Sequence, residues 1–145
     1  MIQIRRGTSI IEIVIAAALI SISIIAALSL TNQSQKQNTY AKGLAEATKY
    51  ANQAADWIRN ERNNLGWATL NTIDNGSYCL SDFPSDFTQI EAGECGATDY
   101  IPNTKFRRNV EINKTVDTIN LVITIIWTEQ VERQAKIEME LTSWH

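Results

Sequence analysis

The sequence predicts an α+β fold in which a long N-terminal α-helix packs on a C-terminal antiparallel β-sheet. Three observations support this fold class. Residues 10–30 form an apolar run that contains a single charge. Small and aliphatic side chains then recur at steps of three and four as far as residue 58, which is the spacing of one helical face. From residue 106 onward apolar and polar side chains alternate, as in strands with one buried face.

The apolar run Ile10–Leu30 has the length of a transmembrane helix. Its 21 residues would extend about 30 Å, which is roughly the thickness of the hydrocarbon core of a bilayer. Arg5 and Arg6 precede it, and a positively charged flank keeps its own end of a helix in the cytoplasm. We therefore expect a single pass through the cytoplasmic membrane, with the C-terminal part outside the cytoplasm.

Glu12 is the one charged residue within this run. A carboxylate inside a transmembrane helix costs about 2.5–3.5 kcal/mol at the bilayer centre, and such residues usually have a partner. No basic residue in the run can serve, and Lys36 would lie about 36 Å further along a helix. The sequence therefore predicts either that Glu12 finds a partner outside the segment or that its side chain snorkels to the interface.

A short basic leader ending in Gly7, followed by Thr8 and by Glu12 at the head of a long apolar helix, resembles the class III signal of type IV pilins and type II secretion pseudopilins. The resemblance implies that prepilin peptidase cuts between Gly7 and Thr8 and that the new amino group of Thr8 is methylated. It also implies that the Glu12 carboxylate pairs with the N-terminal amine of a neighbouring subunit during assembly. Residues 1–7 would be the leader and residues 8–30 the transmembrane and filament-core helix.

The same resemblance implies partners and a location. The partners would be other pilin subunits in a helical filament, prepilin peptidase, an assembly platform in the inner membrane, and membrane lipid before assembly. The protein would begin in the inner membrane with its head outside the cytoplasm, and would end in an extracellular filament or a periplasmic pseudopilus.

Two plainer interpretations of the N-terminus stay open. A Sec signal peptide with a cleavage site near Ala26–Ser29 would have an unusually long apolar core and a misplaced Glu12. An uncleaved signal anchor fits the length and the charge, but it leaves Gly7 and Glu12 unexplained.

Residues 31–64 are expected to continue the helix beyond the membrane as an amphipathic segment. They contain no proline, and one face carries mainly small side chains that would let a sheet pack closely: Leu44, Ala47, Ala51, Ala54 and Ile58. Gly43 lowers the stability of this helix by about 1 kcal/mol relative to alanine. Gly66 is available as a left-handed cap, so we expect the helix to end near residue 64.

Residues 65–105 are predicted to form a loop region with a disulfide. Cys79 and Cys95 are the only cysteines, so they can form one intramolecular bridge, which an exported compartment favours. Asn75-Gly76 predicts a turn, and Ser77–Leu80 predicts a short strand.

Five acidic residues accompany the cysteines: Asp82, Asp86, Glu91, Glu94 and Asp99. They lack the alternating spacing of a dedicated calcium loop, so a solvated acidic face is the main expectation and a calcium site the alternative.

Residues 106–145 are predicted to form an antiparallel meander of three strands. Apolar side chains alternate in three runs, which contain Phe106 to Ile112, Ile119 to Trp127, and Ile137 to Leu141. Arg108 interrupts the first run. Val122 and Ile126 place apolar groups on the second face of the middle strand, so that face is expected to be partly shielded.

Two further segments carry a resemblance to minor pilins of the pilus modification type. They are Asp56–Arg62 followed by Gly66-Trp67, and the final Leu141–Trp144. The resemblance implies a minor or accessory subunit. The alternative for Trp57 and Trp67 is that both are simply core or collar residues beneath the sheet.

Several functional classes find no support in the sequence. The formal charge is −3, and loss of Arg5 and Arg6 leaves 11 basic against 16 acidic side chains, which does not favour nucleic-acid binding. The one histidine is His145, which excludes a histidine-based triad in the core and a multi-histidine metal site. We therefore expect a protein that is not an enzyme and has neither cofactor nor metal.

The expected function is that of a structural subunit, minor pilin-like, of a type IV pilus or related filament. A pseudopilin of a type II secretion or DNA-uptake machine is the alternative within the class. A membrane-anchored extracellular binding module or adhesin, with the disulfide loop as its ligand surface, is the alternative from another class.

Overall fold

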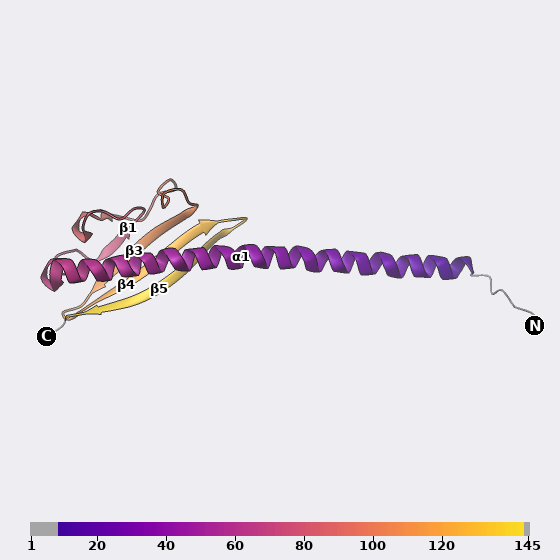
Figure 1. Cartoon of the computed structure of the whole chain (residues 1–145), viewed down its shortest axis with the longest axis horizontal. Helices are drawn as coiled ribbons and strands as arrows, with labels where there is room; N and C mark the ends of the chain where they lie inside the picture. The colour runs from indigo at the N-terminus through magenta and orange to yellow at the C-terminus, as the bar shows by residue number, and fades with distance from the viewer. Residues whose placement is uncertain (1–8, 144–145) are drawn as a thin grey trace, which may run out of the picture. The chain divides into compact units, whose positions relative to one another are not determined.

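A computed structural model describes residues 9–143 and shows one long helix, five strands and a short 3-10 helix in this part of the chain (Figure 1). Their order is α1 (Ile10–Leu70), β1 (Gly76–Cys79), η1 (Phe87–Gln89), β2 (Glu91–Ala92), β3 (Phe106–Lys114), β4 (Thr118–Thr128) and β5 (Glu132–Thr142). The chain divides into two compact units, up to Ala41 and from Lys42 onward.

The second unit is an antiparallel sheet with the C-terminal part of α1 packed on one face. The strand order is β2-β1-β3-β4-β5, and every neighbouring pair is antiparallel. The expected α+β class and the meander of the last three strands are confirmed. The short strand expected near Cys79 is also present, as β1, and it pairs with β3.

The core forms where the small-residue face of the helix meets the apolar face of the sheet. Ala47, Ala51, Ala54 and Ile58 are fully buried, as the helical spacing predicted. Opposite them β4 contributes alternate residues, all buried: Ile119, Leu121, Ile123, Ile125 and Trp127. Methyl side chains allow the helix backbone to approach the sheet closely, and this contact removes much of the apolar surface of the unit from water.

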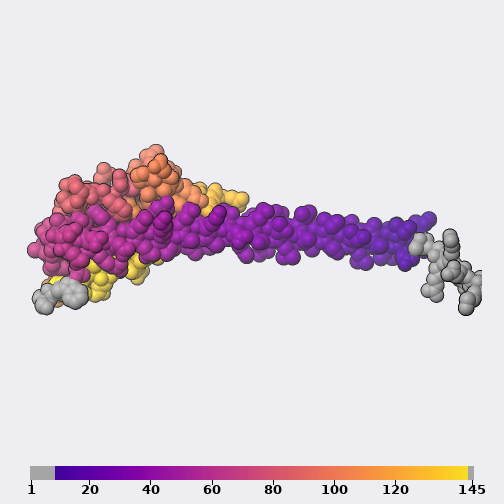
Figure 2. Space-filling model, viewed as in Figure 1, coloured from indigo at the N-terminus to yellow at the C-terminus, as the bar shows by residue number. Residues whose placement is uncertain are grey.

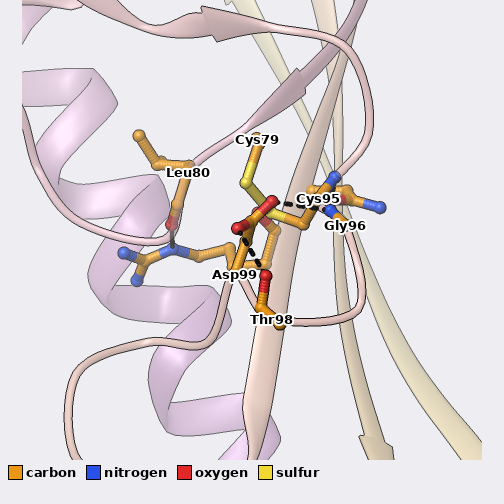
Figure 3. Close-up of a disulfide and its surroundings, with 8 residues drawn as sticks. Cys79, Leu80, Cys95, Gly96, Thr98 and Asp99 are labelled. Carbon is orange, nitrogen blue, oxygen red and sulfur yellow. Dashed lines mark hydrogen bonds between the residues drawn. A yellow bond between two sulfur atoms is a disulfide. The ribbon is translucent and has the colours of Figure 1, made fainter.

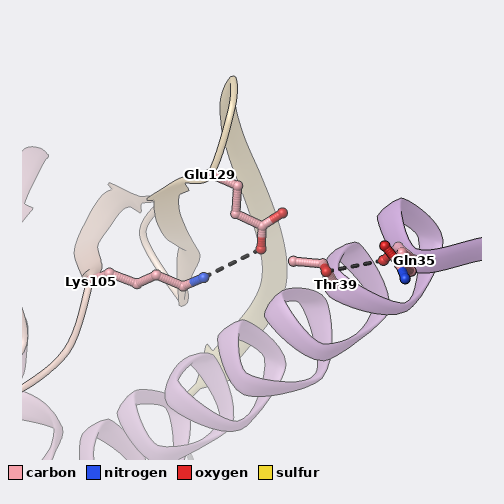
Figure 4. Close-up of polar contacts among 4 residues, drawn as sticks. All are labelled: Gln35, Thr39, Lys105 and Glu129. Carbon is pink, nitrogen blue, oxygen red and sulfur yellow. Dashed lines mark hydrogen bonds and ion pairs between the residues drawn. The ribbon is translucent and has the colours of Figure 1, made fainter. Parts of the chain in front are cut away.

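Gly43 has a packing role that the sequence did not reveal. A Cβ atom at this position would lie 2.7 Å from Nε1 of Trp127 and 2.8 Å from Oε1 of Glu129, so only glycine fits without a shift of these side chains. Glu129 also pairs with Lys105, with 3.3 Å between Oε1 and Nζ (Figure 4). The propensity cost of Gly43 is therefore offset by close packing of α1 against the end of β4.

The helix ends later than the sequence predicted. Regular helical geometry breaks at Gly66, where φ is 78° and ψ is 162°, but another turn follows and α1 reaches Leu70. Leu70 is 1% exposed, so the added turn is held by burial of its last side chain. Gly66 thus marks an interruption rather than the end, and the irregular region starts after residue 70 instead of residue 64.

Arg108, the charged residue within the apolar series of the first strand, lies on the buried face of β3 and is 1% exposed. Its Nε donates to the carbonyl of Leu80 at 2.8 Å, and Nη1 donates to the carbonyl of Tyr50 on α1 at 3.3 Å. The guanidinium carbon lies 4.1 Å from the centre of the Phe83 ring. Burial lowers the pKa of Arg108 to about 10, so the group stays charged at neutral pH.

Candidate functional site

The first unit consists of the N-terminal part of α1, whose apolar side chains lie in the open. The large apolar residues from Ile10 to Leu30 are between 55% and 81% exposed, and this segment forms the indigo end of the chain in Figure 2. Within the described residues α1 is the one helix long and apolar enough to cross a membrane, by length and composition alone. Such an exposed apolar surface is typical of a helix that another apolar phase or another protein covers.

Four hydroxyl side chains of this unit bond within the helix. The hydroxyls of Ser21 and Ser23 donate to carbonyls four residues earlier, each at 2.8 Å, and Thr31 does the same at 3.0 Å. Further along, the Thr39 hydroxyl donates to the carbonyl of Gln35 (Figure 4). A hydroxyl that bonds to its own helix needs no external partner, so these residues are compatible with an apolar environment.

Glu12 is the one charged residue of the apolar run. It lies in the first turn of α1, where a negative charge is favourable to the helix dipole, and its N–H donates to the carbonyl of Ser9 at 2.9 Å. Its side chain is exposed, and within residues 9–143 nothing donates a hydrogen bond to it or forms an ion pair with it. Gly7 and Thr8, the expected cleavage residues, lie outside the described residues.

The second feature of interest is the disulfide-bonded loop, and the expected bridge between Cys79 and Cys95 is present (Figure 3). Both cysteines are 8% exposed, and their Cα atoms are 4.6 Å apart. The Cys95 N–H donates to the side-chain oxygen of Asn109 on β3 at 2.9 Å, so the bridge is anchored to the sheet on both sides.

Acidic residues near the bridge cap the backbone. Asp86 accepts hydrogen bonds from the hydroxyl and the N–H of Thr88, which lower the pKa of its carboxyl group. Asp99 accepts from the N–H of Gly96 at 2.7 Å, and Asp82 accepts from the next N–H in the chain (Figure 3 shows Asp99). In the described part of the chain no group of three or more acidic, histidine or cysteine side chains is placed to hold a metal ion.

Sequence reasoning missed two buried charges that bind this loop to the rest of the unit. One is Arg108; the other is Glu61 on α1, which is 8% exposed. The parity shared by Phe106, Arg108 and Val110 was a signal that Arg108 faces inward. Trp57 is half-buried and packs against the rings of Phe83 and Phe87 at 5.2 and 5.5 Å, so it lies against the loop.

Comparison with protein-family models, with curated proteins and with solved structures finds no match for this chain.

Proposed function

We propose that the chain is the membrane-anchored precursor of a pilin-like structural subunit, which assembles into a helical filament through its N-terminal helix. The observation that carries this proposal is Glu12, a lone carboxylate in an exposed apolar segment in which the hydroxyls of Ser21 and Ser23 bond within the helix. A charge that no part of its own described chain neutralises favours a partner brought by another polypeptide.

The proposed chemistry follows from the resemblance of residues 1–12 to the class III signal. Prepilin peptidase would hydrolyse the peptide bond between Gly7 and Thr8, and the new amine of Thr8 would be methylated. The amine of one subunit would then pair with the Glu12 carboxylate of another in the filament core. Opposite charges attract strongly in a low-dielectric core and each is costly there alone, so mutual neutralisation would set the register between subunits.

Leader cleavage is tested by the intact mass of the full-length chain expressed in cells with and without prepilin peptidase. We expect a product that begins at Thr8 and carries one added methyl group only when the peptidase is present. Gly7→Trp should remain unprocessed because a bulky side chain obstructs access to the scissile bond, whereas Thr8→Ser should be cut like the wild type. A wild-type product that still begins at Met1 in the presence of the peptidase would overturn the proposal.

The role of Glu12 is tested by assembly. Glu12→Ala should be cleaved normally but should be depleted from sheared filaments, and Glu12→Asp, which retains the charge, should assemble better than Glu12→Ala. Wild-type incorporation of Glu12→Ala would refute the pairing with the amine.

The alternatives make different predictions for the same preparation. A pseudopilin of a secretion or DNA-uptake machine would be cleaved in the same way but would stay in a periplasmic pseudopilus. A membrane-anchored binding module would keep residues 1–7 and stay outside filaments. Phe83 and Tyr100, which are 36% and 47% exposed, are the feature that favours a binding surface near the disulfide.

A further inference from the structure

The two edges of the sheet differ greatly in length. One edge is β2, which has two residues, and the other is β5, which has eleven. An edge strand presents unpaired backbone donors and acceptors that can pair with another strand, and a very short edge strand limits this. β5 contains neither proline nor glycine, and it pairs with β4 on one side only within the described residues (Figure 1). The β5 edge is therefore suited to strand addition.

From Ala135 to Glu140, apolar and charged side chains divide between the two faces of β5. Ala135, Ile137 and Met139 lie on the face that packs toward the core, and each is only half-buried. Lys136 and Glu138, together with Glu140, alternate with them and are exposed. The border of the hydrophobic core thus remains open at this edge, while the outer face carries charges of both signs.

We propose that β5 pairs antiparallel with β5 of a second copy of this chain, about a two-fold axis beside Ile137. In this register all eleven residues of each strand overlap. Lys136 of each copy lies opposite Glu138 of the other, and Ile137 lies opposite its own equivalent. Ala135 lies opposite Met139, which matches a small side chain with a long one. The two sheets become one continuous sheet with both apolar faces on the same side.

The charges select this register over its neighbours. Continuity of the apolar face requires the register to change in steps of two residues, and each such step moves the two-fold axis by one residue along the strand. An axis beside Lys136 would place two lysines opposite each other, and an axis beside Glu138 would do the same for two glutamates. An axis beside Ala135 would place Glu132 opposite Glu138, and an axis beside Met139 would place Glu138 opposite Glu140. Among registers that pair at least seven residues, only the axis beside Ile137 brings opposite charges together without opposing like charges.

Charge reversal tests the pairing on the full-length chain in detergent micelles. Lys136→Glu and Glu138→Lys should each raise the dissociation constant of the dimer about tenfold, because each variant opposes like charges at two places. An equimolar mixture of the two variants should form a heterodimer of wild-type affinity, since opposite charges then meet at both places. Glu111→Lys is the matched control, because Glu111 is exposed on the same face but belongs to the inner strand β3. It should leave the dissociation constant unchanged.

A disulfide crosslink tests the register. Cys79 and Cys95 are bonded to each other, so an introduced cysteine provides the reactive thiol. Ile137→Cys should give a covalent dimer on mild oxidation, because residue 137 faces its own equivalent. Met139→Cys, equally half-buried, should give none, because the two equivalents would be four residues out of register.

The pairing is overturned if the chain is monomeric in micelles, if the mixture of variants stays as weak as each variant alone, or if Met139→Cys crosslinks as well as Ile137→Cys. A crosslink from Ile137→Cys to a different polypeptide, identified by mass spectrometry, would assign the edge to another partner and would also overturn it. This inference does not depend on leader cleavage or on Glu12, so its failure and the failure of the filament proposal give different results.

Discussion

The carboxylate of Glu61 on α1 accepts a hydrogen bond from the backbone N–H of Phe87, 26 residues further along the chain, at 3.1 Å. Both residues are buried, and the contact joins the helix to the 3-10 turn within the disulfide loop. The loop is therefore held to the helix by a charge-assisted hydrogen bond, in addition to its covalent bridge and to the packing of Phe83 and Phe87 on Trp57.

Removal of this acceptor should destabilise the unit. Glu61→Ala leaves the N–H of Phe87 buried without its acceptor, which we expect to lower the free energy of unfolding by about 1–3 kcal/mol. Glu61→Gln keeps a side-chain oxygen and should lose less. Urea unfolding followed by tryptophan fluorescence measures both, with exposed Glu46→Ala as the control. Equal stabilities of Glu61→Ala and the wild type would show that the contact contributes nothing.

Arg108 should tolerate substitution poorly. Arg108→Met fills similar space but leaves the carbonyl of Leu80 without its donor, so we expect a loss of about 2–3 kcal/mol in the free energy of unfolding. Arg108→Lys keeps the charge but has no planar fork to reach both Leu80 and Tyr50, so it should also be destabilised. The control is Arg107→Met on the same strand. Arg107 forms an ion pair with Glu132 at the surface, and its loss should lower the free energy of unfolding by less than about 1 kcal/mol. The interpretation fails if both arginines give the same loss.

Gly43→Ala should destabilise the unit although alanine is the better helix former. The added methyl group meets the Trp127 indole, and overpacking of this kind costs about 1–3 kcal/mol, against a propensity gain of about 1 kcal/mol. The loss should shrink when Trp127→Phe provides space, which a double-mutant cycle of thermal or urea unfolding measures. A stabilising effect of Gly43→Ala in the wild-type background would contradict the packing role.

Removal of the disulfide should release the loop before the sheet. Replacement of both Cys79 and Cys95 by alanine opens a loop of about 16 residues, for which the chain-entropy relation gives about 3 kcal/mol. A protease specific for glutamate should then cut at Glu91 or Glu94 faster than in the wild type. Unchanged proteolysis would mean that Glu61 and Arg108 hold the loop without the bridge.

The sequence alone was sufficient for the features that depend on short-range pattern. Helical spacing identified the buried face from Ala47 to Ile58, and alternation identified the strands of the meander, because these periodicities follow directly from backbone geometry. The disulfide followed from the presence of only two cysteines. The apolar run from Ile10 and its single carboxylate, on which the proposed function rests, are likewise properties of the sequence.

Only the tertiary structure decided how the interior charges and the exceptional glycine are used. Arg108 is satisfied by carbonyl groups 28 and 58 residues away, and Glu61 by an N–H in a distant turn. Gly43 of α1 matters because Trp127 of β4 lies against it. The position of β5 at an open edge depends on how β1 and β2 join the opposite side of the sheet. Such contacts join residues far apart in sequence, so no local spacing encodes them.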